Sequence, residues 1–297
     1  MIHASVGNIN VDLIFFVEGM PKEDESVEAK ESYVGLGGAA TNYAIGIRRL
    51  GFPSKLVAYV GKDAKSLGVI EALEKEGVDT SLIKVDNERQ TGIVVVIVNR
   101  QKGSRTMIYA RNANELLEVE ENIEADHVHF SSVRPSIVKR IGKGTISYDP
   151  GGLSCLKPVD VLEALKKVDW AFFNEREARC LGYKNLDSML GKTMSFFVIK
   201  MGSEGAMVIT KKIKITAKYL GEVKVRDPTG AGDAFDASFN ALFKEDGRLE
   251  KALTLAVTAG ALKVERIGGS NMPYKQEILA KSKFTELRKE MEAKSSR

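Results

Sequence analysis

The sequence predicts an α/β protein in which helices pack against a mostly parallel β-sheet. Short runs rich in β-branched and aromatic residues alternate with amphipathic helical runs along most of the chain, and this alternation is typical of parallel sheets. Two stretches depart from it, because they hold strand-like runs with no helix between them. We therefore expect a small second sheet beside the main one. The 297 residues contain no repeat or linker, so we expect a single domain over residues 1–297.

The hydrophobic periodicity places the elements of the main body. Strands are expected at residues 2–6, 54–60, 127–131, 145–148, 170–173 and 196–200. Helices are expected at residues 39–50, 65–76, 159–167, 175–181, 232–243 and 249–265, with a charged terminal helix at 281–297.

The small second sheet is expected from residues 11–38 and 91–114. The run "NRQKGSR" in the second of these segments is typical of a hairpin loop. Such a sheet needs a cover, either a ligand or a second subunit. Its runs "LIFFV" and "IVVVIV" are apolar enough for a contact between two copies of the chain, so a homodimer is one expectation.

Composition and charge exclude several classes of partner. A net charge of +4, with Lys and Arg alternating with Glu along helical runs, does not indicate a nucleic-acid partner. No apolar run approaches the roughly 18 residues of a membrane helix. The start "MIHASVGNINVDLIFF" has no basic region typical of a signal peptide. Cys155 and Cys180 lack a metal-type spacing, so we expect reduced thiols in a cytoplasmic protein.

The stretch "RDPTGAGDAFDASF", residues 226–239, holds the clearest chemical signal. Its glycines permit tight turns, and a helical run follows at once. The backbone N–H groups of Gly230, Ala231 and Gly232 should therefore lie at a helix N-terminus, which favours bound anions. Asp233 has two interpretations on these grounds. It either caps the helix or acts as a general base beside a phosphoryl group.

Two common nucleotide motifs do not describe this loop. It lacks the Gly-Lys-Ser/Thr ending of a P-loop, so it supplies no lysine to phosphates. It also lies late in the chain, without the early βαβ unit of a dinucleotide fingerprint. A dinucleotide-dependent oxidoreductase is therefore not expected.

Two long motifs resemble the signatures of the ribokinase (PfkB) family of sugar and nucleoside kinases. They are "DPTGAGDAF" and "GLGGAATNYAIGIRRLG", and between and around them run "VGNINVD", "TGIVVV", "ANELL", "YDP", "FFNEREA" and "KMGSEGA" in the family's order. The resemblance covers nearly the whole chain. It implies a three-layer α/β/α sandwich whose small β-sheet acts as a lid over the acceptor.

The resemblance also implies roles for residues at both signatures. Asp233 matches the aspartate that deprotonates the acceptor hydroxyl, and the amides of Gly230, Ala231 and Gly232 match the anion hole for the phosphoryl group. The residues matched to acceptor binding are Asn10, Asp12, Gly37, Gly38 and Asn42.

Cofactor sites follow from the same resemblance, with ATP as the expected donor. Asn174 and Glu177, three residues apart at a helix start, match organisers of Mg²⁺ that act through water. Lys200, Gly202, Ser203 and Gly205 match the nucleotide-binding segment. Asp227 and Thr229 lie where many relatives bind a monovalent cation such as K⁺.

The expected function is transfer of the ATP γ-phosphoryl group to a hydroxymethyl oxygen of a sugar or ribonucleoside. Ala39 replaces the lysine usual in ribokinases proper, and the motifs look closest to archaeal nucleoside kinases. A ribose ring, free or within a nucleoside, is the leading acceptor, with fructose or a keto-deoxy sugar acid as alternatives. A ligand-binding or regulatory protein that keeps the fold without catalysis is the alternative from another class.

Overall fold

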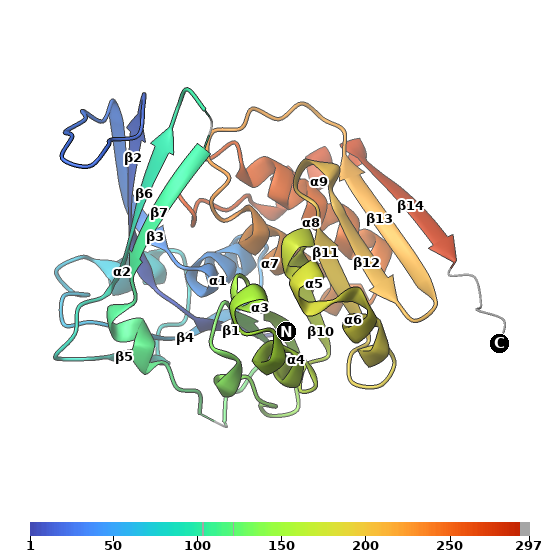
Figure 1. Ribbon diagram of the computed structural model, residues 1–297. Coiled ribbons are helices and arrows are strands. Elements are labelled where there is room, and N and C mark those ends of the chain that lie inside the picture. Colours follow the sequence, from blue (N-terminus) through green and yellow to red (C-terminus); the bar gives the residue numbers. More distant parts are fainter. Residues whose placement is uncertain (103, 121, 292–297) are drawn as a thin grey trace.

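The computed structural model describes residues 1–102, 104–120 and 122–291 (Figure 1). These residues form a ten-stranded main sheet and a separate four-stranded sheet. The main sheet contains β1 (His3–Gly7), β4 (Ser54–Val60), β5 (Ile83–Val85), β8 (His127–Ser131), β9 (Thr145–Asp149), β10 (Trp170–Asn174), β11 (Phe196–Lys200), β12 (Ala206–Thr210), β13 (Ile213–Tyr219) and β14 (Thr285–Met291). The small sheet contains β2 (Asn10–Val17), β3 (Glu31–Gly37), β6 (Gly92–Asn99) and β7 (Ser104–Ala110).

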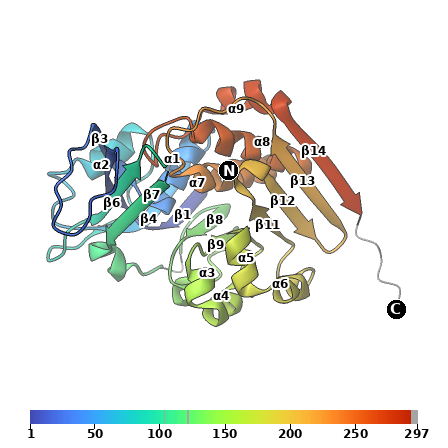
Figure 2. The same ribbon diagram turned by 45° about the horizontal axis from the view of Figure 1, so that its top comes forward.

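The main sheet is the middle layer of a three-layer α/β/α sandwich, as the sequence predicts (Figure 2). One face packs against α1 (Ala39–Arg49), α2 (Val69–Lys75), α7 (Ala231–Asp246) and α8 (Leu249–Lys263). The other face packs against α4 (Pro158–Leu165), α5 (Glu175–Leu181) and α6 (Tyr183–Met189). The remaining α-helices are α3 (Leu153–Leu156) and α9 (Lys275–Lys281).

Local signals set where several helices begin and end. Pro158 occupies the first turn of α4, where its missing N–H costs nothing. Asn174 and Glu177 form a reciprocal capping box at the start of α5. Gly247 ends α7 with a φ of 73°, a left-handed conformation that glycine adopts easily.

The strand order places a crevice at β1. In the main sheet, β1 pairs in parallel with β4 on one side and with β8 on the other. The connections between strands therefore run in opposite directions on the two sides of β1. In α/β proteins, ligands bind outside the carboxyl ends of the strands at such switch points. The chain leaves β1 at Gly7 and enters the small sheet at Asn10. The small sheet therefore starts beside this crevice.

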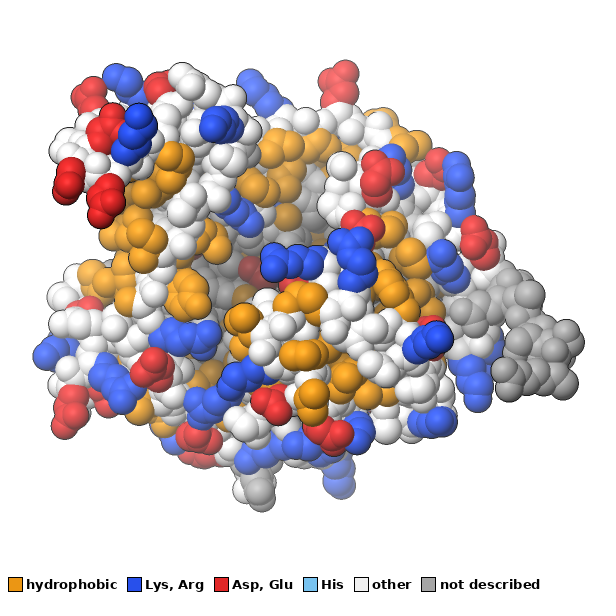
Figure 3. Space-filling model, viewed as in Figure 1, with side chains coloured by type: hydrophobic (Ala, Val, Ile, Leu, Met, Phe, Trp, Pro, Cys, Tyr) orange, Lys and Arg blue, Asp and Glu red, His pale blue; other side chains and the backbone are white. Residues whose placement is uncertain are grey.

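The small sheet comes from the two segments predicted for it. β2 pairs antiparallel with β3 and parallel with β6, and β6 pairs antiparallel with β7, which confirms the expected hairpin. We call this four-stranded sheet the lid. Tyr33 of the lid contacts the body at Gly268, because a methyl group placed on Gly268 would lie 2.6 Å from the Tyr33 ring. The structure therefore holds the lid against the body, and Figure 3 shows the surface hollowed beside it.

The prediction of a terminal helix at 281–297 is wrong over the residues that the structure describes. Thr285–Met291 is strand β14, which pairs antiparallel with β13 at the edge of the main sheet. Leu287 packs against the apolar core while its charged neighbours face solvent, so this segment has the period of a strand. Charged side chains also protect an exposed sheet edge from pairing with other chains. Residues 292–297 lie outside the described residues.

Within the described ranges, no helix combines the length and apolar character needed to span a lipid bilayer.

Candidate active site

The glycine loop turns into α7 as its composition predicts. Gly230 immediately precedes the helix and has a φ of 80°, in the left-handed region. A methyl group at this position would lie 2.3 Å from the Gly269 carbonyl oxygen, so no larger residue fits without movement. The first N–H groups of an α-helix have no acceptor within the helix. Of the three amides expected to bind an anion, that of Ala231 donates to the Pro228 carbonyl at 3.3 Å.

Asp233 does not cap α7. The residue at the cap position is Gly230, and it makes no side-chain capping hydrogen bond. The Asp233 carboxylate instead accepts a 2.7 Å hydrogen bond from the side-chain amide of Asn42. Burial raises the pKa of Asp233 to about 6, although the bond from Asn42 opposes this shift. A carboxylate with this pKa is ionised at neutral pH and accepts a proton more readily than an ordinary aspartate.

Two of the expected acceptor residues, Asn42 and Asp12, lie close enough to this carboxylate to interact with it. Asp12 is 4% exposed, and its Oδ1 has no hydrogen-bond partner among the described residues. Burial raises the pKa of Asp12 to about 7, and the neighbouring carboxylates of Asp227 and Asp233 add to the shift. Asn42 is also buried, and its Oδ1 likewise lacks a partner in the described part of the chain. Buried oxygen atoms of this kind are costly unless a ligand satisfies them.

Glycines make room for these side chains. A methyl group on Gly37 would lie 2.0 Å from an Asp12 carboxylate oxygen. Gly38 has a φ of 96°, and a methyl group there would lie 2.3 Å from the Asn8 carbonyl oxygen. The glycine pair before α1 therefore lets the backbone run directly beside Asp12.

Asn10 has a partner that the sequence did not assign to the site. Its side-chain oxygen accepts a 2.9 Å hydrogen bond from Asn114, whose amide group also bonds both backbone groups of Ile9. Asn114 thus fixes the start of β2, and a methyl group at Gly92 would lie 2.1 Å from its amide nitrogen. The quoted run "ANELL" contains Asn114, but composition alone does not tell a positioning asparagine from a turn residue.

At the expected nucleotide end, Asn174 and Glu177 are hydrogen-bonded to each other. The Asn174 amide donates to Glu177 Oε1 at 2.7 Å, and the Asn174 backbone N–H donates to Glu177 Oε2 at 2.9 Å. Glu177 is only 9% exposed, so its carboxylate is not an ordinary surface group. Its carboxylate oxygens retain lone pairs for water. These hard oxygen groups fit a Mg²⁺ ion that keeps most of its own waters.

A largely buried lysine joins the expected nucleotide end to the glycine loop. The Lys200 ammonium lies 2.7 Å from Asp149 Oδ2 and 3.0 Å from Asp236 Oδ1. Burial opposes its charge, but the two carboxylates outweigh burial and raise the pKa of Lys200. A methyl group on Gly232 would lie 3.3 Å from the same ammonium. Lys200, expected to contact the nucleotide, is thus held by two carboxylates directly behind the predicted anion site.

The other residues predicted to bind nucleotide follow β11. Gly202 and Ser203 lie in a short 3₁₀ turn, Gly202–Glu204. Gly205 has a φ of 89°, and a methyl group there would lie 1.9 Å from the Ala217 carbonyl oxygen. Gly205 is therefore required by the close approach of β13, whatever it contacts in a ligand.

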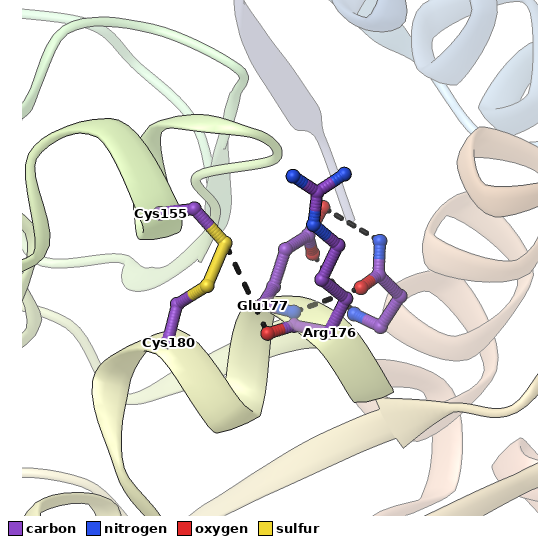
Figure 4. The surroundings of a disulfide bond; sticks show 5 residues. Cys155, Arg176, Glu177 and Cys180 are labelled. Carbon is purple, nitrogen blue, oxygen red and sulfur yellow. Dashed lines mark hydrogen bonds between the residues drawn. A yellow bond between two sulfur atoms is a disulfide. The ribbon is translucent and has the colours of Figure 1, made fainter.

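The prediction of two reduced thiols is wrong. Cys155 and Cys180 form a disulfide, with their Cα atoms 5.0 Å apart, that joins α3 to α5 (Figure 4). The 25-residue separation gave no sign that these two helices pack together. The bond lies beside Arg176 and Glu177 in the first turn of α5 (Figure 4). Disulfides are rare in most cytosolic proteins but common in intracellular proteins of hyperthermophiles.

The fold and site together define a phosphotransferase that acts on a hydroxyl group. Residues 3–276 match the family model described as "pfkB family carbohydrate kinase". The chain belongs to this family, as its motifs predict.

Among curated proteins, the ATP-dependent ribose-1-phosphate kinase of Halopiger xanaduensis is 31% identical over 93% of this chain and 96% of its own. The nucleoside kinase of Methanocaldococcus jannaschii is 29% identical over 90% of this chain and 92% of its own. The crystal structure of the M. jannaschii nucleoside kinase superposes with a TM-score of 0.84 over 95% of this chain and 98% of its own, at 24% identity. That structural match confirms the fold.

Proposed function

We propose that this kinase transfers the γ-phosphoryl group of ATP to the hydroxymethyl oxygen of an acceptor that contains a ribose ring. The observation that carries the proposal is the pair of buried, unpartnered oxygens on Asp12 and Asn42, beside the Asp233 carboxylate, in the described residues. Ribose hydroxyl groups are hydrogen-bond donors that would satisfy both oxygens. A ribonucleoside leads as the acceptor. Ribose 1-phosphate is a further candidate, because it is the acceptor in the name of the H. xanaduensis relative.

In this proposal Asp233 takes the proton from the attacking hydroxyl. Its pKa of about 6 keeps it ionised at neutral pH, while burial leaves it a stronger base than a solvated aspartate. The N-terminus of α7 stabilises the moving phosphoryl group through its free N–H groups and its dipole. The ammonium of Lys200, close behind Gly232, offsets the negative charge of Asp149 and Asp236 beside the loop. Positioning and charge stabilisation supply most of the catalysis of phosphoryl transfer.

The donor half rests on the residues after β10 and β11. Asn174 and Glu177 would hold the waters of Mg²⁺, which on binding neutralises phosphate charge. Gly202, Ser203 and Gly205 would lie along the nucleotide. A reaction that consumes ATP also favours the cytoplasm as the place where the protein acts.

The outer face of the lid supports the proposal of a homodimer. Val34 is 67% exposed and Ile108 is 63% exposed, and Phe15 on the same side of the sheet is 36% exposed. The strand pairing puts all three on the face opposite Asp12 and Ile14. Since a lid that closes on ligand leaves this face uncovered, a second copy is the partner we propose. Sedimentation velocity should give a dimer that V34D together with I108D dissociates, whereas a monomeric wild-type protein would contradict the proposal.

The acceptor is tested by following ADP release with Mg·ATP over a matched panel. The panel contains inosine, guanosine, adenosine, cytidine, ribose, ribose 1-phosphate, fructose and a keto-deoxy sugar acid. We expect turnover with ribose-containing acceptors. The acceptor with the highest kcat/KM shows whether the enzyme prefers a base or a phosphate at C1 of the ring. Turnover with fructose or the sugar acid alone would refute the ribose proposal but leave the kinase assignment intact. Mass spectrometry of the product then locates the new phosphate ester.

A further inference from the structure

The loop expected to hold a monovalent cation has its oxygen atoms engaged by fixed donors. Asp227 Oδ1 accepts from the backbone N–H of Thr229, and Asp227 Oδ2 accepts from that of Gly268, both at 2.9 Å. The Thr229 hydroxyl lies 3.0 Å from the Arg105 guanidinium, which reaches it from the lid. A free cation beside Thr229 would therefore be repelled by a guanidinium already in contact with the proposed ligand.

A lysine brings a second fixed positive charge to the same place. Lys263, the last residue of α8, is fully buried, and its ammonium donates to the Arg266 carbonyl at 3.2 Å. The next residue, Val264, accepts hydrogen bonds from the backbone N–H groups of Arg226 and Asp227, at 2.8 and 3.0 Å. The segment that carries Lys263 is therefore bonded directly to the segment that carries Asp227.

The charges around Lys263 explain how its ammonium is accommodated. Burial lowers the pKa of Lys263 to about 8, while the carboxylates of Asp227 and Asp233 oppose the shift and Arg266 and Arg105 add to it. The side chain is therefore still mostly protonated at neutral pH. Buried ammonium groups are kept charged only by carboxylates or carbonyls around them, and here these groups belong to the glycine loop and the end of α8.

We propose that Lys263 replaces the monovalent cation, so that its ammonium holds the loop before α7 in place and phosphoryl transfer in this protein needs no K⁺. The residues present do not fit the cation that the family resemblance implies at Asp227 and Thr229. The Thr229 hydroxyl is bonded to a guanidinium, and positive charge is already supplied from α8 and from the lid. Lys263 is a positioning residue in this account, since it acts on the reaction through Asp227 and the loop.

The first test compares K⁺ with tetramethylammonium, an ion too large for a carbonyl-lined site. Kinase activity of the wild type, K263A and K244A is measured in each chloride salt at equal ionic strength, with ATP supplied free of alkali metals. Lys244 lies near the other end of α7, half-buried, so K244A is the control for loss of a lysine. We expect the activities of the wild type and K244A to differ less than twofold between salts. K263A should lose at least tenfold in tetramethylammonium and recover at least part of this in K⁺, because K⁺ can then take the place of the ammonium beside the Arg266 carbonyl.

The second test needs no acceptor, so it separates failure of this proposal from failure of the proposed function. The melting temperature of each protein is recorded in the two salts. K⁺ should raise the melting temperature of K263A and leave that of the wild type unchanged. Activation of the wild type by K⁺ of twofold or more would overturn the proposal, and so would a folded K263A that K⁺ neither reactivates nor stabilises. If K263A does not fold, the wild-type comparison alone decides.

Discussion

The Asn42 amide donates a 2.7 Å hydrogen bond to the Asp233 carboxylate, and this bond joins the start of α1 to the start of α7. The two residues are 191 positions apart, and each lies in one of the two long motifs of the sequence. Between them they bring the acceptor end of the site and the glycine loop together. The bond also favours the ionised form of Asp233 and so helps to set the pKa of the proposed base.

Loss of the Asn42 amide should shift the pH dependence of turnover. The bond from Asn42 lowers the pKa of Asp233, whose value of about 6 therefore rises in N42A. Since only the ionised base accepts a proton, activity falls as pH drops through this pKa. The acid limb of the kcat profile, measured at saturating acceptor so that the titration of Asp12 in acceptor binding does not enter, should lie near pH 6 in the wild type and at higher pH in N42A. N185A, which removes an amide bonded to the Leu181 carbonyl, is the control. Superimposable profiles would contradict this account.

Replacement of Asp12 should weaken acceptor binding. In D12N the buried acceptor oxygen becomes an amide, and loss of a hydrogen bond to a charged group costs about 1.5–3 kcal/mol. KM for the acceptor should rise by about tenfold to a hundredfold, with KM for ATP unchanged. Because the pKa of Asp12 is raised to about 7, acceptor affinity in the wild type should improve as pH rises through 7, and D12N should lose this trend. A normal acceptor KM in D12N would remove Asp12 from the site.

Removal of the Lys200 charge should destabilise the fold. K200M leaves Asp149 and Asp236 close together without their shared cation, and breaking a buried ion pair typically costs about 3–5 kcal/mol. Urea unfolding measures this loss directly. The control is K218M, whose partner Glu204 is 68% exposed, and exposed pairs contribute about 1 kcal/mol or less. Equal unfolding free energies for the two variants would mean that the Lys200 ion pairs stabilise the fold no more than an exposed pair does.

Reduction of the disulfide should lower stability. A disulfide between residues 25 positions apart lowers the entropy of the unfolded chain, and this raises the free energy of unfolding by about 3 kcal/mol. The melting temperature should therefore fall when a thiol reductant is added. The double variant C155S/C180S should melt at the reduced value and should not respond to reductant. A melting temperature that reductant leaves unchanged in the wild type would show that the bridge does not contribute.

Sequence patterns predicted the elements whose periodicity is strong and local. The strands at Ser54–Val60, His127–Ser131 and Phe196–Lys200 and the helix at Glu175–Leu181 have the predicted bounds. The helix expected from residue 65 begins only at Val69. β14 was missed because a charged edge strand has too few apolar residues to show its period of two.

The contacts within the site that escaped prediction join distant segments of the chain. Asn114 bonds Ile9 and Asn10 across more than 100 positions, and Lys200 meets Asp149 and Asp236 across 51 and 36. Neither set forms a motif, because the spacing along the chain has no relation to the spacing in the fold. The motif residues could be proposed from the sequence, since a glycine turn before a helix favours anion binding by local geometry alone.

The measurement that tests the central claim most directly compares D233N with the wild type in both binding and turnover. Calorimetric titration gives acceptor affinity, and ADP release at saturating acceptor and Mg·ATP gives kcat. An exposed aspartate of α4 supplies the control variant, D160N. We predict that D233N binds the acceptor nearly as well as the wild type while kcat falls about 10²–10⁴-fold, with D160N unchanged. Near-normal turnover in a folded D233N would contradict the assignment of Asp233 as the base.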